Sequence, residues 1–218
     1  MDFNFGLFVK ILPQLWQGFL MTLLLSVLGM IFATVIGMFV GIARLSKSRW
    51  LTIPTTLYVE IVRGTPLMLQ ILIIYYALPS IGINLEKIPA GVFALAFCYG
   101  AYISEIFRAG IQSIERGQVE AARSIGMTTA QSMRYVILPQ AIRRILPPLT
   151  NDFVAMLKDS SLVAIIALFE LTTTARYIST SSGNVFTPYI GAALFYLLIT
   201  IPVSRLVVLL EKKLGVGQ

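Results

Sequence analysis

The sequence predicts an all-α integral membrane protein with about five transmembrane helices. Of its 218 residues, 57% are hydrophobic and only 12% are charged, whereas about a quarter of the residues of a soluble domain are charged. The apolar residues gather in runs of about 20, the length at which a helix crosses about 30 Å of hydrocarbon. We therefore expect residues 1–218 to form a single transmembrane domain.

The apolar runs place the spans. They cover approximately residues 16–43, 57–78, 88–107, 145–170 and 186–209. The first carries no charge from Trp16 to Ala43, and it is much longer than the apolar core of a signal peptide, so we expect a retained helix. The fourth carries several charges, and the Pro147-Pro148 pair predicts a break in the helix just before them.

The positions of the seventeen Lys and Arg residues predict the orientation, because short cytoplasmic loops are enriched in them. Twelve fall in the 44–49 loop, in the 108–144 segment and at the C-terminal end, whereas only Lys10, Lys87 and Arg176 fall on the opposite side. We therefore predict an N-terminus outside and a C-terminus in the cytoplasm. Basic residues in short loops face lipid headgroups, so nucleic acid is not an expected partner.

Small residues recur every four positions in the first span, at Gly29, Ala33, Gly37 and Gly41. This spacing stacks them on one helix face, where a neighbouring backbone can approach closely. Two interpretations follow: packing within the subunit, or association with a second copy.

The longest stretch between two spans predicts two short helices joined by a glycine turn. Residues 118–124 are expected to form the first helix, with Ala121, Ala122 and Ile125 available for an apolar face. Gly126 follows where a left-handed C-cap is favoured. Thr128 then begins a capping box with the glutamine three residues later, and Pro139 is expected to interrupt the second helix.

This segment resembles the EAA motif of bacterial ATP-binding-cassette importer permeases, E-A-A-x3-G-x9-I-x-L-P. Val136 replaces the isoleucine of the motif, and the matching residues are Glu120, Ala121, Ala122, Gly126, Leu138 and Pro139. In that family the motif forms a cytoplasmic coupling helix that docks in a cleft of the ATPase subunit. The resemblance implies the same role here, and with it the type I importer permease fold.

From about residue 16 to residue 210, the chain resembles the branch of that family that carries polar amino acids such as histidine, glutamine, glutamate and arginine. The resemblance implies a permease that imports polar or charged L-amino acids. It implies as partners two ATPase subunits, a second identical or homologous permease, and an extracytoplasmic amino-acid-binding protein. The residues that carry it are Tyr58 to Leu67 with Gln70, Gly100 to Arg108, Gly117-Gln118, Leu138 to Ala141 and Lys158 to Leu162.

The sequence also bears on cofactors and on competing functions. It contains no G-x-x-x-x-G-K-[ST] segment, so ATP and Mg²⁺ are expected on the partner ATPase and no cofactor on this chain. The chain has no histidine and a single cysteine, Cys98, which argues against a metal site and an intramembrane enzyme. A small ion-coupled secondary transporter or channel remains the alternative.

Ionisable residues at membrane depth are costly and usually mark a pairing or a function. Glu60 with Arg63, and Glu105 with Arg108, have the i,i+3 spacing of ion pairs on one helix face. We expect these four residues to be structural.

The fourth span concentrates the candidate substrate residues Lys158, Asp159, Ser160 and Ser161. Glu170 follows Asp159 by three helical turns, so both carboxylates are expected on one side of a continuous helix. The alternative is an ion pair between Lys158 and Asp159, with Glu170 at headgroup level.

A free amino acid needs hydrogen-bond donors for its carboxylate and an acceptor for its ammonium group. We expect the serine hydroxyls to supply donors and Asp159 or Glu170 to supply the acceptor. Gln70 and Thr65 from the second span are expected to add neutral contacts, and Tyr99 to line the same pathway. The excess of carboxylates favours a cationic substrate such as arginine, lysine or histidine.

Overall fold

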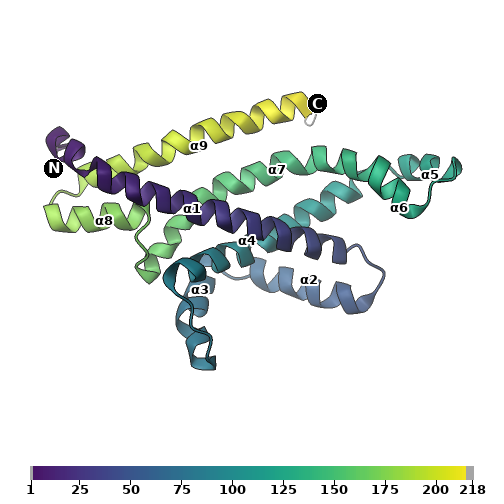
Figure 1. Ribbon diagram of the computed structural model, residues 1–218, viewed down its shortest axis with the longest axis horizontal. Helices are drawn as coiled ribbons and strands as arrows, with labels where there is room; N and C mark the ends of the chain where they lie inside the picture. The colour runs from purple at the N-terminus through teal and green to yellow at the C-terminus, as the bar shows by residue number, and fades with distance from the viewer. Residues whose placement is uncertain (1, 215–218) are drawn as a thin grey trace.

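The computed structural model describes residues 2–214, and this part of the chain is helical throughout, without strands. Three helices are long and apolar enough to cross a membrane: α1 (Phe5–Ala43), α4 (Lys87–Gln112) and α9 (Phe186–Leu214), the last over Phe186–Leu209. A fourth long helix, α7 (Leu138–Asp159), runs beside them (Figure 1). Its charged residues account for its lower hydropathy. The all-helical membrane fold is confirmed, whereas the number of spans stays a prediction.

The stripe of small residues on α1 packs against α4. Gly29 meets Leu95, Gly37 meets Ile103, and all members of the stripe are buried. A Cβ atom on Gly37 would lie 2.6 Å from Cγ2 of Ile103, closer than nonbonded carbon atoms approach. Packing within the subunit is therefore the correct interpretation. Association of two copies through this stripe is wrong, because α4 already covers it.

The second predicted span, residues 57–78, is not one straight helix. The chain forms α2 (Arg49–Arg63), and α3 (Leu67–Leu72) continues into a π-helical turn, η1 (Ile73–Ala77), and a 3₁₀ turn, η2 (Leu78–Ile81). The helix direction changes by 106° between α2 and the segment that begins with α3. Pro66 explains the corner, because it has no N–H and disfavours helical geometry at the residue before it.

The fourth predicted span, 145–170, also differs from expectation. α7 passes through Pro147 and Pro148 without a break, although a proline inside a helix removes a backbone hydrogen bond and its ring crowds the carbonyl one turn earlier. The regular helix ends instead at Asp159. A 3₁₀ helix, η4 (Ser160–Ile166), follows, and Ala167 stops it with a left-handed φ of 51°.

The segment before α7 contains the predicted pair of short helices, α5 (Arg116–Ser124) and α6 (Thr129–Ser132). Gly126 between them has a φ of +84°, and the Thr128 capping box is formed. A π-helical turn, η3 (Met133–Ile137), joins α6 to α7. Pro139 lies in the first turn of α7, directly after this π-helical turn, so the α-helical geometry changes just before the proline and not at it.

The long axis of the molecule separates two kinds of segment. The N-terminus and α8 (Leu171–Ser182) lie at one end, and α5 and α6 lie at the other (Figure 1). This separation agrees with the predicted placement of α5 and the N-terminus on opposite sides of the membrane. The segment from α3 through η2 projects away from the bundle, below α1 and α4 in this view.

Candidate functional site

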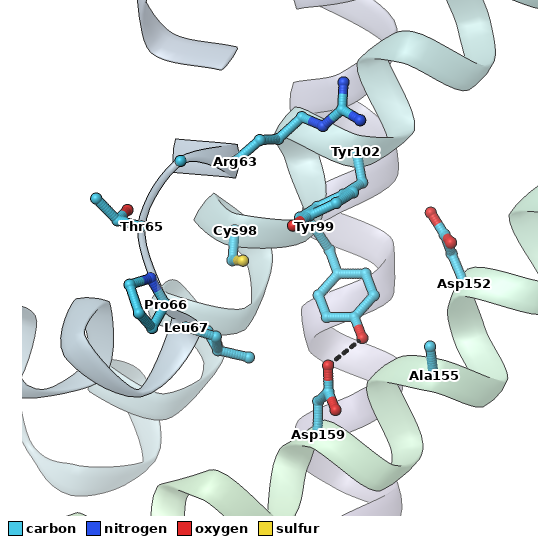
Figure 2. Close-up of a pocket in the computed structure, with 11 residues that line it drawn as sticks. Arg63, Thr65, Pro66, Leu67, Cys98, Tyr99, Tyr102, Asp152, Ala155 and Asp159 are labelled. Carbon is cyan, nitrogen blue, oxygen red and sulfur yellow. Dashed lines mark hydrogen bonds between the residues drawn. The ribbon is translucent and has the colours of Figure 1, made fainter. Parts of the chain in front are cut away.

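A cavity of about 570 Å³ lies where the α2–α3 corner faces α4 and α7 (Figure 2). The corner brings backbone and side chains from a broken helix to the cavity wall, the arrangement in which transporters expose polar groups to a ligand. The lining residues are Arg63, Gly64, Thr65, Pro66 and Leu67 from the corner, Cys98, Tyr99 and Tyr102 from α4, and Asp152, Ala155 and Asp159 from α7.

Tyr99 and Asp159 form the polar contact at one end of the cavity. The phenol hydroxyl of Tyr99 donates a hydrogen bond of 2.7 Å to Asp159, drawn as a dashed line in Figure 2. The Tyr99 side chain is buried, and Asp159 is half-buried at the last residue of α7. The bond leaves the other carboxylate oxygen of Asp159 available to a ligand in the cavity.

Asp152 places a second carboxylate on the same face of α7. It precedes Asp159 by two helical turns, about 10 Å along the axis, and the small Ala155 lies between them. One of its carboxylate oxygens is buried and has no hydrogen-bond partner within residues 2–214. A buried polar atom without a partner is costly, so this oxygen favours a cationic or hydrogen-bond-donating occupant.

Arg63 provides the opposite charge. Its guanidinium lies 5.3 Å from the centre of the Tyr102 ring and 3.7 Å from Glu105. Glu105 also binds Arg44 of the α1–α2 loop, and it accepts hydrogen bonds of 2.6 and 2.9 Å from Arg108. The predicted pair of Glu105 and Arg108 is therefore confirmed.

The other predicted ion pair, between Glu60 and Arg63, is wrong. Arg63 reaches Glu105 on the neighbouring helix instead, and Glu60 makes no ion pair among the described residues. Because α2 ends at Arg63, this side chain leaves the helix at the corner and points along α4 rather than back along α2.

Glu170 lies outside the cavity, in a cap. Its carboxylate accepts hydrogen bonds from the backbone N–H groups of Thr172 and Thr173, at 2.8 and 2.6 Å, and from the Tyr196 hydroxyl at 3.2 Å. Glu170 is the N-cap of α8 and is completely buried. An acceptor at this position satisfies N–H groups that have no partner in the helix.

Comparison with known proteins places this geometry in a family. Residues 33–216 match the family described as the binding-protein-dependent transport system inner membrane component. The chain belongs to this family. It is therefore an inner-membrane permease component, and the ATPase of such a system is a separate subunit.

Individual relatives cover nearly the whole chain. A probable glutamine ABC transporter permease protein, GlnM, of Bacillus subtilis is 44% identical over 91% of this chain and 92% of its own length. A probable amino-acid ABC transporter permease protein of Sinorhizobium fredii is 37% identical over 94% of this chain and 89% of its own length. The resemblance to amino-acid permeases that the sequence carries is thus confirmed.

Solved structures agree with the fold. The crystal structure of an amino acid ABC transporter with histidines contains a chain that is 42% identical, with a TM-score of 0.92, covering 98% of this chain and 100% of that one. A chain of the MetNI methionine ABC transporter in an inward-facing conformation has a TM-score of 0.73 at 20% identity, covering 92% of this chain and 98% of its own. The latter likeness concerns the fold alone.

The permease cavity gathers only part of the predicted substrate set. Thr65, Tyr99 and Asp159 line it. Lys158 is exposed, does not line the cavity and forms no ion pair with Asp159, so the alternative of a Lys158–Asp159 pair is wrong among the described residues. Ser161 does not line the cavity either.

Two other predicted residues stabilise the permease backbone around the cavity. Ser160 is buried and donates its hydroxyl to the carbonyl of Leu157 at 2.8 Å. Gln70 is also buried, and its amide donates to the carbonyl of Val62 at 2.9 Å and to Thr65. Gln70 thereby ties α3 to the end of α2 and holds the corner that forms the cavity wall.

Glu170 corrects the expectation of a helix face shared with Asp159. It shares no helix face with Asp159, because α7 ends at Asp159. The 3₁₀ helix η4 and the left-handed Ala167 then separate α7 from α8. Its side chain is completely buried, and its depth in the membrane stays a prediction. Its hydrogen bonds make it a structural residue of the α8 N-terminus.

Asp152 and Arg63 are the charged cavity residues that lie outside the predicted substrate set. The seven-residue spacing of Asp152 and Asp159 was a usable signal, since it places two carboxylates on one helical face. Arg63 had no such signal. Its i,i+3 spacing with Glu60 predicted an ion pair within α2. The corner after α2 directs the Arg63 side chain toward Glu105 instead.

The EAA segment of the permease has an exposed tip. Glu120, Ala121 and Gly126 are exposed, and Ile125 exposes 75% of its surface. Of the three residues expected to be available for an apolar face, Ala122 is buried, whereas Ala121 and Ile125 are exposed. An isoleucine this exposed at the end of α5 is free to contact another protein. Leu138 and Pro139 are exposed at the start of α7.

Proposed function

We propose that this chain is the permease subunit of an importer that carries polar or charged L-amino acids into the cytoplasm, with a preference for basic ones. The relatives named for glutamine and for amino acids, and the related transporter structure with histidines, support the substrate class. The observation that carries the proposal is the pair of carboxylates, Asp152 and Asp159, on one wall of the cavity.

The chemistry of an amino acid fits this wall. Its ammonium group loses water on entering the cavity and needs an anionic acceptor in return. Asp159 supplies one, and the Tyr99 hydroxyl holds it in place. Asp152 offers a second acceptor, with an oxygen that has no hydrogen-bond partner in the described part of the chain. Two carboxylates match two cationic groups, which is why a basic amino acid is favoured over a neutral one.

We further propose that α5 and its exposed tip dock on the ATPase subunit. Gly126 sets the turn after the helix, and Glu120, Ala121 and Ile125 face outward from it. ATP and Mg²⁺ then bind on two such subunits and not on this chain. A second identical or homologous permease, an extracytoplasmic amino-acid-binding protein and an N-terminus on the outer side of the membrane complete the proposal.

The proposal is tested by uptake into proteoliposomes that contain the complete transporter, with ATP inside and the binding protein outside. We expect ATP-dependent uptake of at least one polar amino acid. Asp159→Asn keeps the shape of the side chain but removes its charge, and we expect it to lower the affinity about tenfold to a hundredfold. Basal ATP hydrolysis and assembly should persist.

Two outcomes contradict the proposal. Uptake that continues without ATP and stops when the ion gradient is collapsed supports a secondary transporter instead. Unchanged affinity and selectivity in Asp159→Asn and in Asp152→Asn, measured one at a time, place the substrate elsewhere. The matched control is Asp2→Asn, outside the cavity, which is expected to leave uptake unchanged.

A further inference from the structure

The cluster around Glu105 has more positive charge than this carboxylate can neutralise. Arg44, Arg108 and Arg63 come from three different segments and converge on it. A guanidinium stays protonated in proteins, so the cluster holds three positive charges against one negative charge. Such an excess is costly in surroundings of low dielectric constant, and it favours the binding of a further anion.

Among the described residues, Arg63 is the arginine of this cluster whose side chain makes no hydrogen bond. Both oxygens of Glu105 already accept from the other two, Oε1 from Arg44 and Oε2 from Arg108. Arg63 lies 3.7 Å from Oε1, beyond hydrogen-bonding distance, and its side chain makes no hydrogen bond within residues 2–214. Its side chain is 45% exposed, more than that of Arg44 at 14% or Arg108 at 33%.

The position of Arg63 makes these donors available to the cavity. Arg63 and Tyr102 both line it, whereas Arg44, Glu105 and Arg108 do not. The guanidinium rests against the Tyr102 ring, which orients it without occupying its N–H groups. Figure 2 shows the Arg63 side chain at one end of the cavity and Asp159 at the other. The cavity therefore has a cationic end and an anionic wall.

We propose that Arg63 binds the carboxylate of the transported amino acid, whose cationic groups then face the carboxylates of α7. This inference rests on the proposed function, and it adds the orientation of the substrate in the cavity, with its carboxylate toward α2 and its cationic groups toward α7. The planar guanidinium can bind a carboxylate through two parallel hydrogen bonds. Glu105 holds Arg44 and Arg108 in place, and Arg63 is the residue that binds the substrate carboxylate.

The test is direct binding of radiolabelled amino acid to the purified permease–ATPase complex in nanodiscs, without the binding protein. The competitors are the unlabelled amino acid and its α-amide, which has no carboxylate. We expect the wild-type complex to prefer the amino acid over the amide by about tenfold to a hundredfold. In Arg63→Gln this preference should disappear, because affinity for the amino acid falls while affinity for the amide changes little.

Arg108→Gln is the matched control. It removes a guanidinium from the same Glu105 carboxylate, but Arg108 does not line the cavity, so the preference should persist. Arg63→Lys keeps the charge without the planar fork, and we expect an intermediate preference. If Arg63→Gln does not assemble, the comparison of Arg63→Lys with the wild-type complex carries the test.

The outcomes separate the inference from the proposed function. A wild-type complex that neither binds nor transports any amino acid overturns both. If the wild-type complex transports an amino acid but Arg63→Gln still prefers it over the amide, only the role of Arg63 is wrong. An equal loss of preference in Arg108→Gln also overturns it, because the effect then arises from the cluster and not from contact with the substrate.

Discussion

The hydroxyl of Tyr99 donates to the carboxylate of Asp159 at 2.7 Å, and this bond joins the middle of α4 to the end of α7. It lies at the point where α7 gives way to 3₁₀ geometry. The same carboxylate thus takes part in the contact between two helices and in the wall of the cavity.

The first prediction concerns this bond. Tyr99→Phe removes the donor and leaves Asp159 free to rotate, so we expect a loss of substrate affinity smaller than that of Asp159→Asn. Because the two residues contact each other, the double variant should lose less than the sum of the single losses. Affinity measured for all four proteins by radioligand binding gives this coupling, and strictly additive losses would show that the bond does not position Asp159.

The second prediction concerns Glu170. In the native protein the backbone N–H groups of Thr172 and Thr173 donate to the two carboxylate oxygens of Glu170. Glu170→Gln replaces one of these oxygens with an NH₂ group, which cannot accept, so we expect the complex to lose about 1–3 kcal/mol of stability. Its melting temperature should fall while its substrate affinity stays unchanged. Asp159→Asn should show the opposite pattern, with lower affinity and little change in melting. A selective loss of affinity in Glu170→Gln would return this residue to the substrate site.

The third prediction concerns the contact between α1 and α4. Gly37→Ala places a methyl group 2.6 Å from Ile103, and overpacking of this kind costs about 1–3 kcal/mol. The control is Gly91→Ala on α4, where the nearest atom would be 3.4 Å from the new methyl group. Thermal unfolding in detergent should be lowered in the first variant and little changed in the second. Equal melting temperatures would show that the helices separate easily.

The fourth prediction concerns coupling. Gly126 has a φ of +84°, which a β-branched residue adopts only with strain. Gly126→Val should therefore weaken ATPase binding and abolish transport while membrane insertion persists. Gly126→Asn, which tolerates this conformation, should retain more activity. Gly117→Val is a size control in the same segment, because no atom lies within 4 Å of a Cβ there and its φ is not positive.

The fifth prediction concerns orientation. In a Cys98→Ala background, a cysteine at Ile125 should be protected from an impermeant thiol reagent in intact cells, and a cysteine at Ser181 should react. The side chains of Ile125 and Ser181 are both exposed. Labelling in opened membranes controls for access. Reaction at Ile125 with protection at Ser181 in intact cells would reverse the predicted topology.

The parts of the structure that follow local rules were predictable from the sequence. The apolar runs predicted α1, α4 and α9, and the four-residue spacing of glycines predicted a close helix contact. The capping box at Thr128 and the left-handed glycine at 126 follow from a few neighbouring residues, and both are present. Each of these features depends on the chemistry of a short segment.

The breaks in the helices were not predictable in this way. Pro66 bends the chain whereas Pro147 and Pro148 do not, although each lacks an N–H group. At Pro66 the side chain of Gln70 compensates for the break by binding Val62 across it. Such compensation depends on residues that meet only in the folded chain. The same is true of Asp152, whose spacing was visible but whose cavity was not.

The interlocking of Gly37 with Ile103 also has a consequence for the transport cycle. Two helices whose backbones meet through a glycine cannot slide or roll past each other without a collision at that residue. We therefore expect α1 and α4 to move as one rigid body during the transport cycle, while the other helices move relative to this pair. The cavity residues on α4, Tyr99 and Tyr102 among them, then keep a fixed position relative to α1.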